Sequence, residues 1–138
     1  MYRKLYPALV LAAALFGTAC DNDLENDPGP TGPSPTTTEN FEGTINANGA
    51  VTHTFNTAAL GVITVTLTEV TPDATVPVSL VLGTWNGIVC QMSLAMDTAV
   101  QGNQLLGSVS GGGSLCVRVH DNGRLTAPLN YKLTVVHP

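Results

Sequence analysis

From Phe41 onward, apolar and polar residues alternate with period two, and this alternation limits the fold more than any other feature of the sequence. In residues 63–68, isoleucine, valine and leucine occupy the odd positions and threonine occupies the even ones. Alternation of this kind is typical of a strand that buries one of its faces. β-Branched residues dominate these runs, and no part of residues 41–138 has a convincing helical period. The sequence therefore predicts an all-β domain.

Turn signals separate the predicted strands. Asn-Gly, the strongest short-range hairpin signal, occurs at 48–49, 86–87 and 122–123, and further reversals are expected at 72–73 and 111–113. Pro77 indicates an edge strand or the start of a strand. Seven or eight short strands favour a single antiparallel β-sandwich of the jelly-roll or immunoglobulin-like type, with an open barrel as the alternative. The expected strands are 41–46, 50–57, 61–70, 76–84, 88–95, 104–109, 114–120 and 129–136.

The first 19 residues have the layout of a secretory signal peptide. Arg3 and Lys4 precede the apolar run 5–16, and small residues follow that run. Twelve residues span only about 18 Å as a helix, which is too short for a permanent transmembrane segment. The end of the segment, GTAC, resembles the bacterial lipobox, which implies that Cys20 is lipidated and becomes the first residue of the mature protein. Ordinary signal peptidase cleavage after Ala19 is the alternative.

Residues 20–40 are expected to form a tether between the lipidated cysteine and the domain at 41–138. The segment contains four prolines and one aliphatic residue, so it cannot bury enough apolar surface to fold. It also holds half of the 10 acidic residues of the chain. A calcium loop is not expected there, because the loop glycine and the closing glutamate are missing at the required positions. With acyl chains on Cys20, the lipid bilayer is the first expected partner.

The overall charge excludes strong binding to nucleic acid. The chain has 5 Lys and Arg against 10 Asp and Glu, so it could neutralise few phosphates.

The odd cysteine count has a simple explanation. The chain has three cysteines, and if Cys20 is lipidated, Cys90 and Cys116 remain as a pair in an oxidising compartment. We expect them to form a disulfide. Cys116 lies in the polar phase of its predicted strand, which places the bridge at a sheet edge or on an outer face.

Three sequence blocks of the domain resemble the bacterial pre-peptidase C-terminal domain. The blocks are GVITV (61–65), GSLCVRV (113–119) and YKLTV (131–135), in the order typical of that family, and the resemblance covers nearly all of residues 41–138. Leu115 replaces a usual tyrosine, and the cysteine pair is an addition. The resemblance implies a β-sandwich that serves secreted enzymes as a targeting or adhesion module. Residues 1–40, which stand ahead of the domain, are not expected to form a peptidase.

The sequence does not assemble a catalytic site. A Ser-His-Asp arrangement would combine His120 with Asp121 and either Ser110 or Ser114, but Asp121 directly adjoins His120. The acidic residues of the domain are predicted to lie at strand ends and in turns. This argues against a pair of catalytic carboxylates for glycoside hydrolysis. A zinc site from Cys90, Cys116 and His120 lacks a CxxC element. We expect no enzyme activity, no metal and no cofactor.

Trp85, Arg118 and Arg124 are the candidate ligand-binding residues. Trp85 precedes an Asn-Gly turn, so it either meets a ligand at a loop tip or caps the end of the core. The two arginines flank the turn at 121–123 and either contact an acidic partner or pair with Asp121. A protein or polysaccharide ligand is expected.

The sequence thus predicts a non-catalytic lipoprotein of the bacterial cell envelope that presents a β-sandwich as a binding or adhesion module. The alternative is a structural or accessory subunit of an envelope or secreted-enzyme complex, which would use a sheet face or edge. The expected location is exported and lipid-anchored, with the inner and outer membranes not distinguished.

Overall fold

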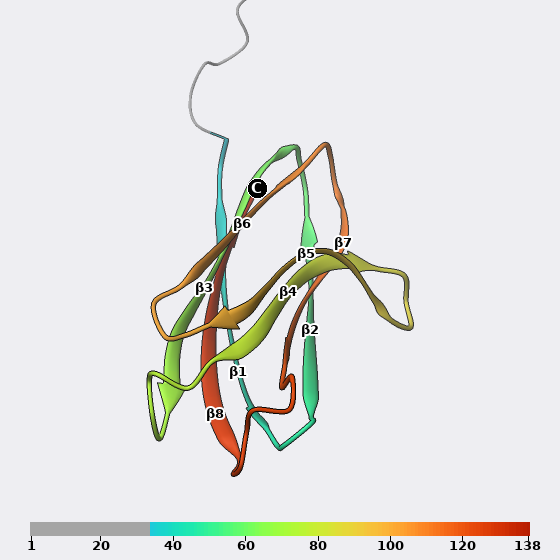
Figure 1. Ribbon diagram of the computed structural model, residues 1–138. Helices are drawn as coiled ribbons and strands as arrows, with labels where there is room; N and C mark the ends of the chain where they lie inside the picture. The colour runs from blue at the N-terminus through green and yellow to red at the C-terminus, as the bar shows by residue number, and fades with distance from the viewer. Residues whose placement is uncertain (1–33) are drawn as a thin grey trace, which may run out of the picture. The chain divides into compact units, whose positions relative to one another are not determined.

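Eight strands form two antiparallel sheets in the computed structural model, which describes residues 34–138 (Figure 1). The predicted all-β sandwich is therefore confirmed. The lipidation site expected at Cys20 and the leader before it lie outside the described residues. The strands are β1 (Thr37–Ile45), β2 (Ala50–Thr57), β3 (Gly61–Thr71), β4 (Val78–Trp85), β5 (Cys90–Ala99), β6 (Gln104–Val109), β7 (Gly113–His120) and β8 (Leu129–His137).

The strand order is that of a jelly roll. Sheet A has the order β1-β8-β3-β6, and sheet B has the order β2-β7-β4-β5. Strand β1 pairs with β8, β2 with β7, β3 with β6 and β4 with β5. This is the pairing that results when one long hairpin folds into two sheets. This order selects the jelly roll over the immunoglobulin-like and open-barrel alternatives.

Two of the three expected Asn-Gly hairpins are not hairpins. Only the turn at 86–87 joins paired strands, β4 and β5. The turns at 48–49 and 122–123 carry the chain from one sheet to the other, because β1 and β8 belong to sheet A and β2 and β7 to sheet B. Positive φ angles occur at Asn48, Gly87 and Gly123. The sequence therefore located the reversals correctly, but local turn chemistry does not determine which sheet the next strand joins.

The domain begins earlier than the predicted boundary at Phe41. Strand β1 starts at Thr37, because the backbone of residues 37–40 pairs with the end of β8. Polar side chains reinforce this pairing: Thr134 Oγ1 donates to Asn40 Oδ1 at 2.8 Å, and His137 Nε2 lies 3.0 Å from Glu39 Oε1. Residues 37–40 lack apolar alternation, so the sequence did not distinguish them from the tether.

The core lies between the two sheets. The odd-numbered residues of 63–67 and 129–135 point inward from sheet A, and those of 115–119 point inward from sheet B. A register shift between Leu67 and Glu69 changes the phase of β3, so Val70 is also buried. Pro77 comes immediately before β4, which confirms the expected strand start, although β4 is an inner strand of sheet B and not an edge.

The predicted disulfide is confirmed and crosses an intervening strand. Cys90 at the start of β5 is bonded to Cys116 on β7, although β4 separates these two strands. Cys116 pairs in register with Gly83 of β4 and lies on the outer side of sheet B, opposite the inward Leu115 and Val117. A Cβ at Gly83 would overlap the carbonyl group of Gln91. Glycine at this position therefore lets β5 cross close over β4 and bring Cys90 to its partner.

Candidate functional site

A hollow beside Trp85 is the best candidate for a ligand site. Its volume is about 420 Å³, and it opens between the end of β4, the end of β2 and the glycine-rich loop that joins β6 to β7. Trp85 is half-buried, so part of its side chain remains accessible. The lining residues are Thr57, Thr84, Trp85 and 108–115.

The lining of this hollow is uncharged. Apart from Trp85 and two aliphatic side chains, it consists of hydroxyl groups and glycine backbone. Thr57 is buried, and its Oγ1 lies 3.3 Å from Gly111 O and 3.4 Å from Gly113 O, which ties the loop to β2. One aromatic face with several neutral donors and acceptors is suited to a neutral, hydroxyl-rich ligand or to a polar backbone, and not to an ion.

Arg118 and Arg124 do not pair with Asp121. Both arginine side chains are exposed, and within residues 34–138 neither forms a salt bridge. Arg124 Nη1 instead donates to the backbone oxygen of Asp97 at 2.8 Å. Arg118 points outward from β7, in register with Val81 of β4. Of the two alternatives, pairing with Asp121 is therefore wrong: the Arg118 guanidinium is available to an acidic partner, and that of Arg124 is partly engaged by Asp97.

Asp121 is a structural residue. It is 7 % exposed, and its carboxylate accepts hydrogen bonds from the backbone amides of Asn48, Arg124 and Leu125 at 2.8–3.1 Å. Desolvation alone would raise the pKa of Asp121, but these amides outweigh it and hold the pKa below the usual value of 3.8. Asp121 thus fastens the β7–β8 turn to the β1–β2 turn.

The serine–histidine combinations considered from the sequence do not form. Ser114 lies at the opposite end of β7 from His120 and donates to Asn56 Oδ1 at 2.7 Å. His120 instead pairs in register with Ser79, whose hydroxyl donates to Asp97 Oδ1 at 2.8 Å.

The structure thus groups Ser79, Asp97 and His120, which sequence reasoning missed. Ser79 is 1 % exposed, so a substrate cannot reach its hydroxyl, and His120 Nδ1 is buried without a hydrogen-bond partner. Only the register between β4 and β7, which are far apart in the sequence, reveals this proximity.

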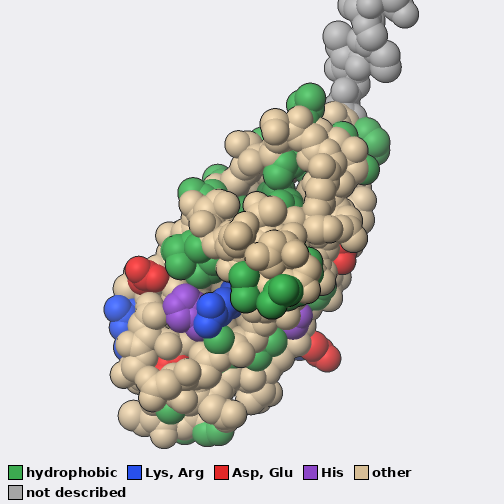
Figure 2. All heavy atoms as spheres, turned by 90° about the vertical axis from the view of Figure 1, so that its right-hand side faces the viewer, with side chains coloured by type: hydrophobic (Ala, Val, Ile, Leu, Met, Phe, Trp, Pro, Cys, Tyr) green, Lys and Arg blue, Asp and Glu red, His purple; other side chains and the backbone are tan. Residues whose placement is uncertain are grey.

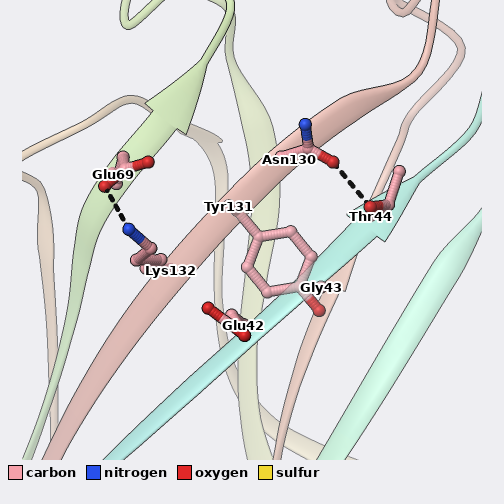
Figure 3. A pocket seen from close by; sticks show the side chains of 7 residues that line it. All are labelled: Glu42, Gly43, Thr44, Glu69, Asn130, Tyr131 and Lys132. Atoms are coloured by element: carbon pink, nitrogen blue, oxygen red, sulfur yellow. Dashed lines mark hydrogen bonds and ion pairs between the residues drawn. The ribbon is translucent and has the colours of Figure 1, made fainter.

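A second hollow, of about 400 Å³, lies on the outer face of sheet A (Figure 3). Figure 3 shows Lys132 between the carboxylates of Glu69 and Glu42. Lys132 Nζ donates to Glu69 Oε2 at 2.7 Å, and this hydrogen bond raises the pKa of Lys132 above its usual value. Both partners are exposed, so the pair is a solvated surface ion pair of small energetic value.

His53 forms a polar link between the two sheets. Its Nε2 lies 2.8 Å from the hydroxyl of Tyr131 on β8, and its ring stacks on Phe41 of β1 at 4.9 Å between centroids. Gly43 makes this possible, because a Cβ there would collide with the Tyr131 ring. Burial lowers the pKa of His53 below 6.5 and raises the pKa of Tyr131 to about 12. Both groups are therefore held neutral near pH 7.

The zinc set considered from the sequence is not available as thiolates. Cys90 and Cys116 are consumed by the disulfide. Among residues 34–138 no group of three His, Cys, Asp or Glu side chains is arranged to hold a metal ion. In the same part of the chain, no helix has the length and apolarity needed to span a membrane.

Comparison with known proteins adds no assignment: no protein-family model matches the chain, and no curated protein matches its sequence. The resemblance to the pre-peptidase C-terminal domain stays a prediction.

Proposed function

We propose that the protein is a non-catalytic lipoprotein of the bacterial cell envelope that presents a disulfide-linked jelly roll as a binding module. The observation that carries the binding part is the uncharged hollow beside Trp85, where a half-buried aromatic ring meets a tied glycine loop. The disulfide supports export, because such bonds persist in oxidising compartments. The signal layout and Cys20 support the lipid anchor.

Fractionation of cells tests the anchor. The native chain should be in the membrane fraction, and a Cys20→Ser variant should leave that fraction or stay unprocessed. A Thr54→Val variant is the matched control, because it changes an exposed strand position and leaves both the anchor and the disulfide intact. Equal amounts of processed native and processed Cys20→Ser chain in the membrane fraction would contradict the proposal.

Binding is tested by titration calorimetry with defined ligands. A soluble neutral glucan, soluble peptidoglycan fragments and the acidic polymer polygalacturonate represent the polysaccharide classes of an envelope and its surroundings. We expect saturable binding to the neutral glucan, lost in Trp85→Ala and kept in Thr54→Val, which alters an exposed strand position that makes no side-chain hydrogen bond. Equally strong binding by Trp85→Ala would show that the hollow beside Trp85 is not the binding site.

A second candidate function is a structural or accessory subunit of an envelope or secreted-enzyme complex. Strands β5 and β6 are edges of their sheets and expose Leu94 and Leu106, which are 40 % and 61 % accessible. Unpaired edges with apolar side chains favour strand addition by a partner. If this function holds, Leu106→Lys should dissolve an assembly seen by sedimentation velocity. A native chain that is monomeric with and without envelope extract would argue against it.

A further inference from the structure

The turn between β4 and β5 exposes an unusual group of apolar side chains. In this tip, defined as residues 85–92, Ile88 is 82 %, Val89 52 % and Met92 64 % accessible. Single exposed apolar residues are common on proteins, but several on one projecting turn mark a contact surface. No residue from 84 to 96 carries a charge. The tip projects to the right in Figure 1, away from the two sheets.

The tip is held in a fixed conformation. Asn86 Oδ1 accepts hydrogen bonds from the amides of Ile88 and Val89 at 2.9 and 2.8 Å, and Asn86 N donates to Val89 O at 3.3 Å. Cys90, at the base of the tip, is bonded to Cys116 of β7. The apolar side chains are thus presented by a preorganised turn, which lowers the ordering cost of any contact they make.

We propose that this tip inserts into the interfacial region of the phospholipid bilayer to which Cys20 anchors the chain. The inference rests on the proposed lipid anchor and adds a second attachment to it. An uncharged tip enters the interface without desolvating a charge, and a tryptophan at its base suits the headgroup level. A ligand in the hollow beside Trp85 would then be held close to the bilayer.

Charge on the surrounding face complements a lipid surface. Arg118 lies two residues after Cys116 on the same outer side of sheet B, and its guanidinium forms no salt bridge within residues 34–138. Figure 2 shows hydrophobic side chains beside Lys or Arg and His side chains on this face. A guanidinium group on the same face as an apolar tip is placed to meet anionic headgroups while the tip enters the interface.

The segment between the anchor and the domain is long enough for this contact. Residues 20–33 precede the described chain, and at about 3.3–3.6 Å per residue they reach at most about 50 Å. The strands have 6 to 11 residues, so the longest spans about 37 Å. Any side of the domain can therefore reach the bilayer, and tethering raises the effective concentration of the tip at the surface.

Trp85 gives a direct readout, because it is the one tryptophan of the chain. The mature chain, from Cys20 to Pro138, is coupled through the Cys20 thiol to a maleimide-headgroup lipid in vesicles that contain anionic phospholipid. The vesicles contain lipid brominated either close to the headgroup or near the chain ends. We expect a blue shift and a loss of Trp85 emission, stronger with bromine close to the headgroup.

Paired variants separate insertion from simple proximity. Ile88→Ser/Val89→Ser should abolish the quenching. Leu60→Ser/Val62→Ser, which changes two exposed apolar residues outside the tip (66 % and 62 % accessible), should keep it. Unquenched Trp85 in the coupled native chain, or quenching that survives in the tip variant, would overturn the inference. Trp85 that is shielded only when a protein partner is added would also overturn it, in favour of a protein contact.

The coupling also separates this inference from the proposed lipoprotein function. Attachment through the maleimide lipid does not depend on acylation in the cell. Native protein without acyl chains would contradict the proposed anchor, while the quenching measurement would still decide the behaviour of the tip.

Discussion

At the scale of single residues, three buried polar groups connect parts of the jelly roll that the hydrophobic core alone would leave free. The hydroxyl of Tyr131 forms a hydrogen bond with His53 between the two sheets. The carboxylate of Asp121 accepts hydrogen bonds from backbone amides of two turns. His137, 3 % exposed, joins the end of β8 to Glu39 of β1. Each group has its partner, so removal of one partner leaves the other unsatisfied.

Tyr131→Phe removes a hydroxyl without changing the packed ring. His53 Nε2 then loses its partner in a half-buried position, so the free energy of unfolding should fall by about 1–2 kcal/mol. The change is measured as the urea midpoint and the melting temperature, with Thr54→Val as a surface control that should change stability by less than about 0.5 kcal/mol. A Tyr131→Phe variant as stable as the native chain would show that the hydrogen bond between Tyr131 and His53 does not stabilise the domain.

The pKa of His53 predicts a pH dependence of stability. Burial holds the folded pKa below 6.5, so as the pH falls through 6.5 the unfolded chain takes up a proton before the folded one does. Stability contributed by neutral His53 is therefore fully present above pH 6.5 and declines below it, until the folded pKa is passed. Urea midpoints of native and His53→Asn chains across this range should show a steeper decline in the native chain. An NMR titration midpoint for His53 at or above 6.5 would contradict the assignment.

Asp121 governs a lower pH range. Its folded pKa is depressed, so its contribution is present above pH 3.8 and is lost as the pH falls through the folded pKa. Asp121→Ala leaves buried amide donors without an acceptor and should cost roughly 2 kcal/mol. Asp73→Ala, at an exposed turn carboxylate, is the matched control, and equal losses in the two variants would argue against the role of Asp121.

At the scale of strands, β4 and β5 carry the features that distinguish this jelly roll. The bridge from Cys90 to Cys116 passes β4 at Gly83, and the same hairpin presents Trp85 and the apolar tip. The disulfide closes a loop with a sequence separation of 26. A loop of this length contributes about 3.5 kcal/mol in the chain-entropy treatment, which is a large share of the stability of a small domain.

Gly83→Ala tests the close crossing of β5 over β4. The added methyl group would overlap the backbone of Gln91, which cannot move without breaking strand pairing, so we expect a loss of about 3 kcal/mol. Gly111→Ala is the matched control, because a Cβ there meets nothing within 4 Å and the residue is not among those with positive φ. Equal stability of the two variants, measured by urea unfolding, would show that β5 does not lie over Gly83.

Strand pattern and turn chemistry were readable from the sequence, because both are local. Alternation and turn signals together located all eight strands, and the fifth was predicted to end at 95, whereas β5 runs to Ala99. Sheet membership was not readable, because pairing such as that of β1 with β8 joins segments about 90 residues apart. Trp85 could be identified from the sequence because its turn signal is local. The proximity of Ser79, Asp97 and His120 could not, because it depends on the register between distant strands.

At the scale of the whole molecule, the sequence predicts a leader and an acidic proline-rich tether ahead of a domain with little net charge. Only the domain lies within the described residues, and it starts at β1, four residues before the expected boundary. In the proposed function, Cys20 attaches the protein to the bilayer and the uncharged hollow beside Trp85 binds the ligand.

The intact mass of the protein extracted from membranes tests this account most directly. We predict a chain that begins at Cys20, carries acyl chains on that residue and shows no free thiol at Cys90 or Cys116 when labelled without reductant. A chain that retains Met1, or that begins at Cys20 or Asp21 without lipid and is recovered from the soluble fraction, would contradict the central claim.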